Sequence, residues 1–172
     1  MVRARRRSAV PGHGSPSPAK PVGLKELVGA GDRILLVTVP FVILGLALNI
    51  AFPAVFEVGG PPAALRAISI VLLILGIVIW LWSVVLVLTR VPRRELITSG
   101  PFAVVRHPIF TSVSLLVIPA LGVLLNSWLG LVVGIVMYVS ARIFGREEEA
   151  VLARTFGSAW DEYRASVKIP WL

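Results

Sequence analysis

The stretch Leu96-Ile-Thr-Ser-Gly-Pro-Phe-Ala-Val-Val-Arg-His-Pro-Ile-Phe110 decides the fold of this chain, together with a later segment, Arg146-Glu-Glu-Glu-Ala-Val-Leu-Ala-Arg-Thr-Phe-Gly-Ser-Ala-Trp-Asp-Glu-Tyr163. Between them, the run from Ile109 to Ala141 is apolar and contains no charged residue. It is longer than the roughly 20 residues of one membrane crossing, and Asn126-Ser127 lies near its middle. We therefore expect a tight helical hairpin that brings the two polar segments to the same membrane surface, where they form a pocket.

The composition of the chain is that of an integral membrane protein. Hydrophobic residues make up 56% of the 172 residues, charged residues only 15%, and the mean hydropathy is +0.88. Two further uncharged runs, residues 34–56 and 67–89, are each long enough to cross the bilayer as a helix. With the hairpin at residues 109–125 and 127–144, the sequence predicts an all-α, polytopic membrane protein with about four transmembrane helices. C-terminal amphipathic helices at residues 146–168 are expected to cap the pocket.

The placement of Lys and Arg predicts the orientation of these helices, because basic residues near the ends of spans stay on the cytoplasmic side. Seven lie before the first expected span, one in the first loop, four in the second loop, none at the hairpin turn and five after the last span. This alternation predicts a multi-pass protein of the plasma membrane or cell inner membrane with both termini in the cytoplasm. The pocket would then lie on the cytoplasmic face.

The net charge of +8 is carried by the first residues of the chain and by loops beside the expected spans. Membrane orientation and contact with membrane lipid explain this charge, so no nucleic-acid partner is expected. Residues 1–23 are rich in Pro, Gly and Arg and are predicted to form a disordered basic tail, which leaves residues 24–172 as the membrane domain. The absence of cysteine excludes disulfides and thiolate ligands, and with only two histidines no metal site is expected.

The first polar segment has the pattern of a turn that leads into a helix. Thr98-Ser99-Gly100-Pro101 is a turn signature, and Pro108 suits the first position of a helix. Aromatic rings and Arg106 would gather at that helix N-terminus, where free backbone N–H groups can bind a polar ligand. A purely structural interpretation also accounts for Arg106, His107 and Pro108, as residues that meet lipid headgroups and begin a helix.

The second polar segment carries three consecutive carboxylates on a helix. Glu148 shares a side of that helix with Leu152, so at least one carboxylate borders an apolar face. Such a carboxylate needs a partner, for example Arg106, His107 or a ligand hydroxyl. The alternative is a solvated charge run on an interfacial helix, which we favour for Glu147.

Together these segments resemble the isoprenylcysteine carboxyl methyltransferase and phospholipid methyltransferase superfamily of integral membrane enzymes. The family pattern is Leu-x-Thr-x-Gly-x-Tyr-x-x-x-Arg-His-Pro-x-Tyr, then Glu-Glu-x-x-Leu-x-x-x-Phe-Gly-x-x-Tyr-x-x-Tyr. The chain meets it at Leu96, Thr98, Gly100, Arg106, His107, Pro108, Glu148, Glu149, Leu152, Phe156, Gly157 and Tyr163. The resemblance extends over residues 90–170, and the first two spans match only as hydrophobic segments.

The resemblance implies a methyltransferase with S-adenosylmethionine as its cofactor and a small hydrophobic or lipid-like acceptor. The cofactor would bind between the second loop and the C-terminal helix. Carried over position by position, the cofactor-binding residues are Arg94, Glu95, Leu96, Ile97, Phe102, Arg106, His107, Pro108, Ile109, Phe110, Glu148 and Glu149. A non-enzymatic membrane scaffold that retains the family fold is the alternative.

The chain departs from the family pattern at aromatic and charged positions. Family members often carry Tyr where this chain has Phe102 and Phe110, so ring stacking is retained while hydroxyl groups are lost. The arginine that orients the carboxylate in isoprenylcysteine methyltransferases is aligned with Phe144. Arg142 and Arg146 are the candidates to replace it as catalytic residues that orient the acceptor, and an isoprenylcysteine acceptor is not favoured.

Overall fold

The computed structural model describes residues 30–170, and helices take up 81% of this part of the chain. The expected disordered tail, residues 1–23, lies outside the described residues. Three helices are long and apolar enough to cross a membrane: α2 (Ala30–Ala51), α4 (Ala63–Arg90) and α7 (Leu129–Phe156). A fourth apolar helical stretch, Pro108–Leu124, is shorter. The all-helical membrane class is confirmed, whereas four crossings remain a prediction.

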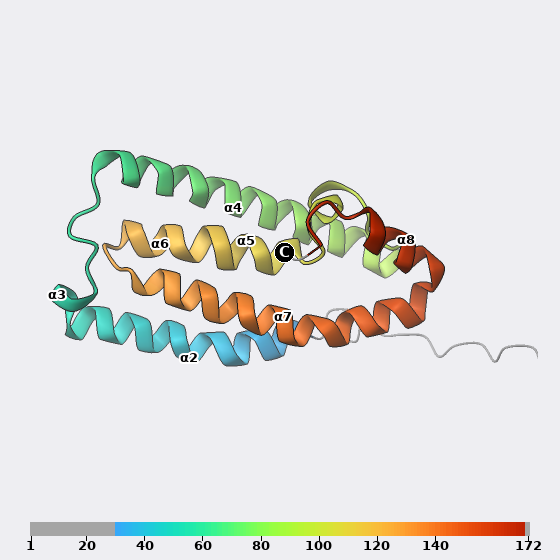
Figure 1. The fold of residues 1–172 in the computed structure, drawn as a ribbon, viewed down its shortest axis with the longest axis horizontal. Coiled ribbons are helices and arrows are strands. Elements are labelled where there is room, and N and C mark those ends of the chain that lie inside the picture. Colours follow the sequence, from blue (N-terminus) through green and yellow to red (C-terminus); the bar gives the residue numbers. More distant parts are fainter. Residues whose placement is uncertain (1–29, 171–172) are drawn as a thin grey trace, which may run out of the picture.

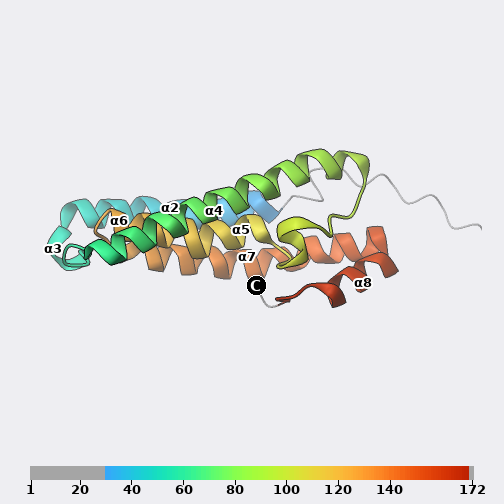
Figure 2. The same cartoon turned by 90° about the horizontal axis from the view of Figure 1, so that it is seen from above.

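The long helices lie side by side, with the shorter apolar stretch between them. This stretch consists of α5 (Pro108–Ser112), a π-helical segment (Val113–Val117) and α6 (Ile118–Leu124). It packs against α4 on one side and α7 on the other, and α2 packs along the far side of α7 (Figure 1). The last helix, α8 (Ser158–Ser166), folds back beside the end of α7, as the view from above shows (Figure 2).

The outer surfaces of α2 and α4 are apolar. Only 11% of the residues in their most hydrophobic windows are buried, and Leu36, Ile50 and Leu88 are among the most exposed apolar side chains. Such a surface is unfavourable in water and is the surface that a helix presents to lipid. Inside the bundle, α4 buries the small residues Ser69, Gly76 and Ser83, which allow the close approach typical of membrane helices.

The hairpin turn lies where the sequence predicts it. Asn126 has a φ of +57°, and the N–H of Ser127 donates to the carbonyl of Gly122 at 2.7 Å. On either side of this turn α6 and α7 come so close that a Cβ atom on Gly122 would lie 2.7 Å from the Cα atom of Gly130. The glycines near the middle of the apolar run therefore allow the contact between the two arms of the hairpin.

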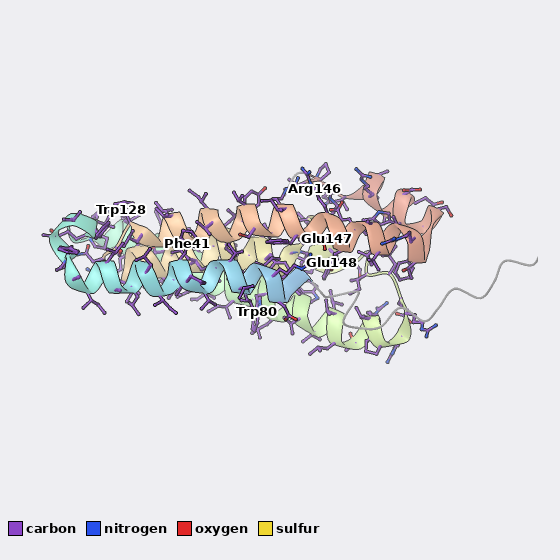
Figure 3. All side chains as sticks on the ribbon, turned by 90° about the horizontal axis from the view of Figure 1, so that it is seen from below. Phe41, Trp80, Trp128, Arg146, Glu147 and Glu148 are labelled. Atoms are coloured by element: carbon purple, nitrogen blue, oxygen red, sulfur yellow. The ribbon has the colours of Figure 1, made fainter. Side chains whose placement is uncertain are left out.

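The turn that follows α2 is tied to this hairpin turn. It contains α3 (Pro53–Phe56), whose Phe56 carbonyl accepts from the N–H of Trp128 at 3.0 Å. The rings of Phe56 and Trp128 also lie 5.4 Å apart between centroids. Figure 3 shows Trp128 at this end of the molecule and the charged residues of α7 toward the other end. The two turns therefore close one end of the bundle, and the polar segments gather at the opposite end.

The boundary expected between the last span and the C-terminal helices is absent. The expected elements were residues 127–144 and 146–168, but α7 runs without a break from Leu129 to Phe156. The reason is that the residues after position 145 include good helix formers such as Glu, Ala and Leu. The helix ends at Gly157, whose φ of +54° is readily adopted by glycine.

Candidate functional site

The segment between α4 and α5 makes a compact turn at the polar end of the bundle. It contains two short 3₁₀ helices, Val91–Arg93 and Gly100–Ala103. Gly100 has a φ of +63°, in agreement with the turn predicted before Pro101, and α5 begins at Pro108 with His107 as its N-cap residue. The structure therefore confirms the predicted start of the helix and brings the rings and charges of this segment next to α7.

The C-terminal segment is bound to this turn by hydrogen bonds. The hydroxyl of Tyr163 in α8 donates to the carbonyl of Phe102 at 2.9 Å, and the N–H of Ile169 donates to the carbonyl of Val104 at 2.9 Å. Burial raises the pKa of Tyr163 to about 12, so the hydroxyl stays a neutral donor at physiological pH. Tyr163 also packs with Trp160 and Val167 in a small apolar core. Helix α8 is therefore held as a cap over the turn.

A cavity of about 160 Å³, open on one side, lies under this cap. All but one of the predicted cofactor-binding residues line this first cavity: Arg94, Glu95, Leu96, Ile97, Phe102, Arg106, His107, Pro108, Ile109, Phe110 and Glu148. The two polar segments, far apart in the sequence, therefore enclose one space.

Helix α7 contributes one of its faces to the first cavity. Glu148, Leu152 and Phe156 are spaced four residues apart, so they lie on one side of the helix, and all three line the cavity. Residues two positions apart on a helix point in nearly opposite directions, and Figure 3 shows Arg146 and Glu148 on opposite sides of α7. Glu148 is only partly exposed and brings a carboxylate to an otherwise largely apolar wall.

Glu149, the remaining predicted cofactor residue, lies in a hydrogen-bonded wall beside the first cavity. Its carboxylate is 2.9 Å from Nη1 of Arg106 and 3.1 Å from Nε2 of His107. Arg106 also donates to the carbonyl of Pro170. The side chain of Arg106 is 9% exposed and that of His107 is 12% exposed, so this wall of three side chains, Arg106, His107 and Glu149, is shielded from solvent.

The predicted acceptor-orienting arginines lie on the other side of this wall. Arg142 and Arg146 line a second cavity together with Arg106, His107 and Glu149, and neither lines the first. The remaining lining residues of the second cavity are Ala141, Gly145 and Arg164. The structure therefore separates Arg142 and Arg146 from the first cavity, although they share the second cavity with three of the predicted cofactor-binding residues.

Phe144 takes no part in either cavity. Its ring packs against the apolar cluster formed by Ile34, Met137 and Ala141. Phe144 is therefore part of the contact between α2 and α7. Among residues 30–170, no group of His, Asp or Glu side chains is arranged as a metal site.

Six further residues line the first cavity but were not predicted from the sequence to be site residues: Val87, Val91, Leu152, Phe156, Trp160 and Tyr163. The helical spacing from Glu148 was a signal for Leu152 and Phe156. No local pattern indicated Val87 and Val91, because an apolar residue near the end of a span looks the same whether it faces lipid or a cavity.

Residues 63–154, more than half of the chain, match the isoprenylcysteine carboxyl methyltransferase (ICMT) family. The chain belongs to the ICMT family. It is thus a membrane methyltransferase of the ICMT kind. The matched region includes α4, the hairpin and most of α7, and therefore both walls of the first cavity except for α8. Searches of curated proteins and of solved structures find no match.

Proposed function

We propose that this ICMT-family protein transfers a methyl group from S-adenosylmethionine to a small hydrophobic or lipid-like acceptor at the cytoplasmic membrane surface. The observation that carries the proposal is the first cavity, because residues of both family motifs line it and it combines an apolar wall with the carboxylate of Glu148. A non-enzymatic scaffold would not need such a cavity.

The residues of the first cavity fit the chemistry of S-adenosylmethionine. When bound, this cofactor supplies an electrophilic methyl group on a positively charged sulfur. Glu148 can accept hydrogen bonds from a hydroxyl or amino group, and the rings of Phe102 and Phe110 can stack on a base or face a cation. The first turn of α5 leaves the N–H groups of Ile109 and Phe110 without partners inside the helix, so they are available to a polar ligand group.

The contribution of the chain to the reaction is positioning in a space with little water. Methyl transfer is a displacement at carbon, and its rate depends on holding the acceptor atom in line with the methyl group. The cap formed by α8 excludes water, since Tyr163 and Trp160 are buried against the turn. No acid–base residue is required if the acceptor arrives as a carboxylate, an uncharged amine or a thiolate.

The acceptor is proposed to enter from the membrane between α4 and α5. Val87 from the end of α4 and Val91 from the 3₁₀ helix that follows it form an apolar part of the cavity wall together with Ile109 and Phe110 from α5. The neighbouring Leu88 is exposed on the lipid-facing side of α4. The resemblance aligns Phe144 with the arginine that orients the carboxylate of an isoprenylcysteine, and Phe144 packs outside the cavity, so an isoprenylcysteine acceptor is not favoured.

Cofactor binding by the full chain in detergent tests the proposal. Glu148→Gln removes the negative charge and keeps the size of the side chain. A charge-assisted hydrogen bond contributes about 1.5–3 kcal/mol, so the Kd for S-adenosylmethionine should rise about tenfold or more. Isothermal titration calorimetry measures this change directly.

Glu147→Gln is the matched control for this experiment. Glu147 is the adjacent carboxylate, but it is exposed and pairs with Arg33 on the surface, so its loss should leave the Kd nearly unchanged. The wild-type chain should also bind S-adenosylhomocysteine. No binding of either compound to the wild-type chain would favour the scaffold, and equal effects of the two variants would remove Glu148 from the site.

A further inference from the structure

The second cavity has a different character from the first, and the proposed methyl transfer does not use it. Its volume is about 310 Å³. Its polar lining consists of Arg106, Arg142, Arg146, Arg164, His107 and Glu149. Arg142 and Arg146 come from α7, and Arg164 comes from α8. Charged side chains from two helices therefore surround one space.

Positive charge is in excess around the second cavity. Four guanidinium groups border it, against the single carboxylate of Glu149. That carboxylate is already engaged by Arg106 and His107. Between residues 30 and 170, no ion pair includes Arg142, Arg146 or Arg164. The side chains around the second cavity therefore carry more positive than negative charge.

This arrangement favours the entry of an anion into the cavity. Arg142 and Arg146 are one helical turn apart on α7, where like charges repel. Arg142 is only partly exposed, so water screens this repulsion less well than at an open surface. In the shared wall, Nε of Arg106 is also buried without a hydrogen-bond partner, which is uncommon for a buried donor.

We propose that the second cavity is a binding site for a phosphate group. Phosphate offers several acceptor oxygens to the planar, forked donors of more than one arginine, whereas a single arginine fork already matches a carboxylate. The position along α7 agrees with this chemistry. Residues 129–141 are uncharged, and Arg142 begins the charged part of the helix, at the level where lipid headgroups are expected.

The phosphate can come from a phospholipid headgroup or from solution, and two measurements on the full chain in detergent distinguish these sources. Native mass spectrometry compares adducts with dioleoyl phosphatidylglycerol and with dioleoylglycerol, which has the same acyl chains but no phosphate. Thermal unfolding compares sodium phosphate with sodium chloride at equal ionic strength. The test variant is Arg142→Gln/Arg146→Gln. The control is Arg93→Gln/Arg154→Gln, which removes the same charge at exposed positions outside both cavities.

For a lipid source, the wild-type chain and the control should bind phosphatidylglycerol but not dioleoylglycerol. The test variant should lose about tenfold or more of this binding. For a solution source, phosphate should raise the Tm of the wild-type chain and the control but not that of the test variant. A test variant that behaves like the control in both measurements would overturn the proposal.

The Tm measured without phosphate distinguishes an anion-binding role of the arginines from a structural role. Because the test variant removes a repulsion, its Tm in phosphate-free buffer should equal or exceed that of the wild-type chain. A lower Tm would contradict the proposal, since the arginines would then stabilise the fold by themselves. The single variant Arg146→Gln changes an exposed side chain and should show the same loss of phosphate binding to a smaller degree. The affinity for S-adenosylmethionine, measured in parallel, reports separately on the first cavity.

Discussion

At the scale of single residues, Arg106, His107 and Glu149 form the wall that the two cavities share. Arg106 and His107 line both cavities, and Glu149 holds them together. Gly145 makes room for the wall, because a Cβ atom at this position would lie 3.2 Å from Nε2 of His107. The absence of a side chain at residue 145 therefore fixes where the imidazole ring can lie.

Gly145→Ala should displace the imidazole of His107 and weaken its contact with Glu149. We expect an increase of about threefold to tenfold in the Kd for S-adenosylmethionine, the size of one hydrogen bond lost or distorted. The stability of the protein should change little, because the helix preference of alanine over glycine, about 0.5–1 kcal/mol, offsets the weakened hydrogen bond, about 0.5–1.5 kcal/mol. Calorimetric titration and thermal unfolding measure the two effects.

A double-mutant cycle with His107→Ala identifies the route of this effect. If Gly145→Ala acts through the imidazole ring, it should change the Kd little in the His107→Ala background. An equal change in both backgrounds would show that the added methyl group acts on the cavity without His107.

At the scale of elements, the hairpin of α6 and α7 sets the position of the polar end of α7. Its arms touch through backbone atoms, since a Cβ atom on Gly130 would lie 2.6 Å from the Cα atom of Gly122 and 2.9 Å from the carbonyl oxygen of Ile118. Backbone cannot move aside as a flexible side chain can. The separation of the arms, and with it the position of Glu148 and Glu149, therefore depends on these two glycines.

Gly130→Ala should separate the arms of the hairpin and destabilise the protein by about 1–3 kcal/mol, the usual cost of overpacking. The Tm in detergent should fall, and S-adenosylmethionine binding should weaken with it. Gly45→Ala in α2 is the matched control, because its Cβ atom would meet Val133 at an ordinary 3.5 Å. This control should have an unchanged or higher Tm, and an equal fall in both variants would contradict the role of the close contact.

At the scale of the whole molecule, the two ends of the bundle differ in chemistry. Helices α3 and α8 lie at opposite ends of the molecule (Figure 1). The end with α3 is closed by the turns around Phe56 and Trp128, and the end with α8 carries the two cavities. The distribution of Lys and Arg predicts that the cavity end faces the cytoplasm. An aqueous cofactor would then reach the first cavity from the cytosol, and a lipid-like acceptor would reach it from the bilayer.

Labelling of single cysteines should verify this orientation, because the natural chain contains no cysteine. Ser99→Cys and Ser158→Cys, both at exposed positions of the cavity end, should react with a membrane-impermeant maleimide only when the cytoplasmic side is accessible. Glu57→Cys, in the exposed turn at the other end, should react from the opposite side. Labelling of Ser99→Cys and Glu57→Cys from the same side would contradict the predicted orientation.

Much of this architecture follows from the sequence alone. Uncharged runs of membrane length must form helices, because backbone N–H and C=O groups find no other hydrogen-bond partners in lipid. The central apolar run, with Asn126-Ser127 near its middle, predicts a hairpin, and a hairpin returns the chain to the side on which it entered. The sequence therefore determined the all-α membrane class and the meeting of the two polar segments at one end.

Only the tertiary structure decided which side chains share a cavity. Glu148 and Glu149 are adjacent in the sequence, but a helix turns by about 100° between neighbours, so they line different cavities. For the same reason Arg142 and Arg146 lie on the side of α7 away from the first cavity. The closure of α8 over the turn depends on the contact of Tyr163 with Phe102, two residues that are distant in the sequence. Helix rotation and long-range contacts of this kind leave no local pattern to read, because they depend on how all the helices pack together.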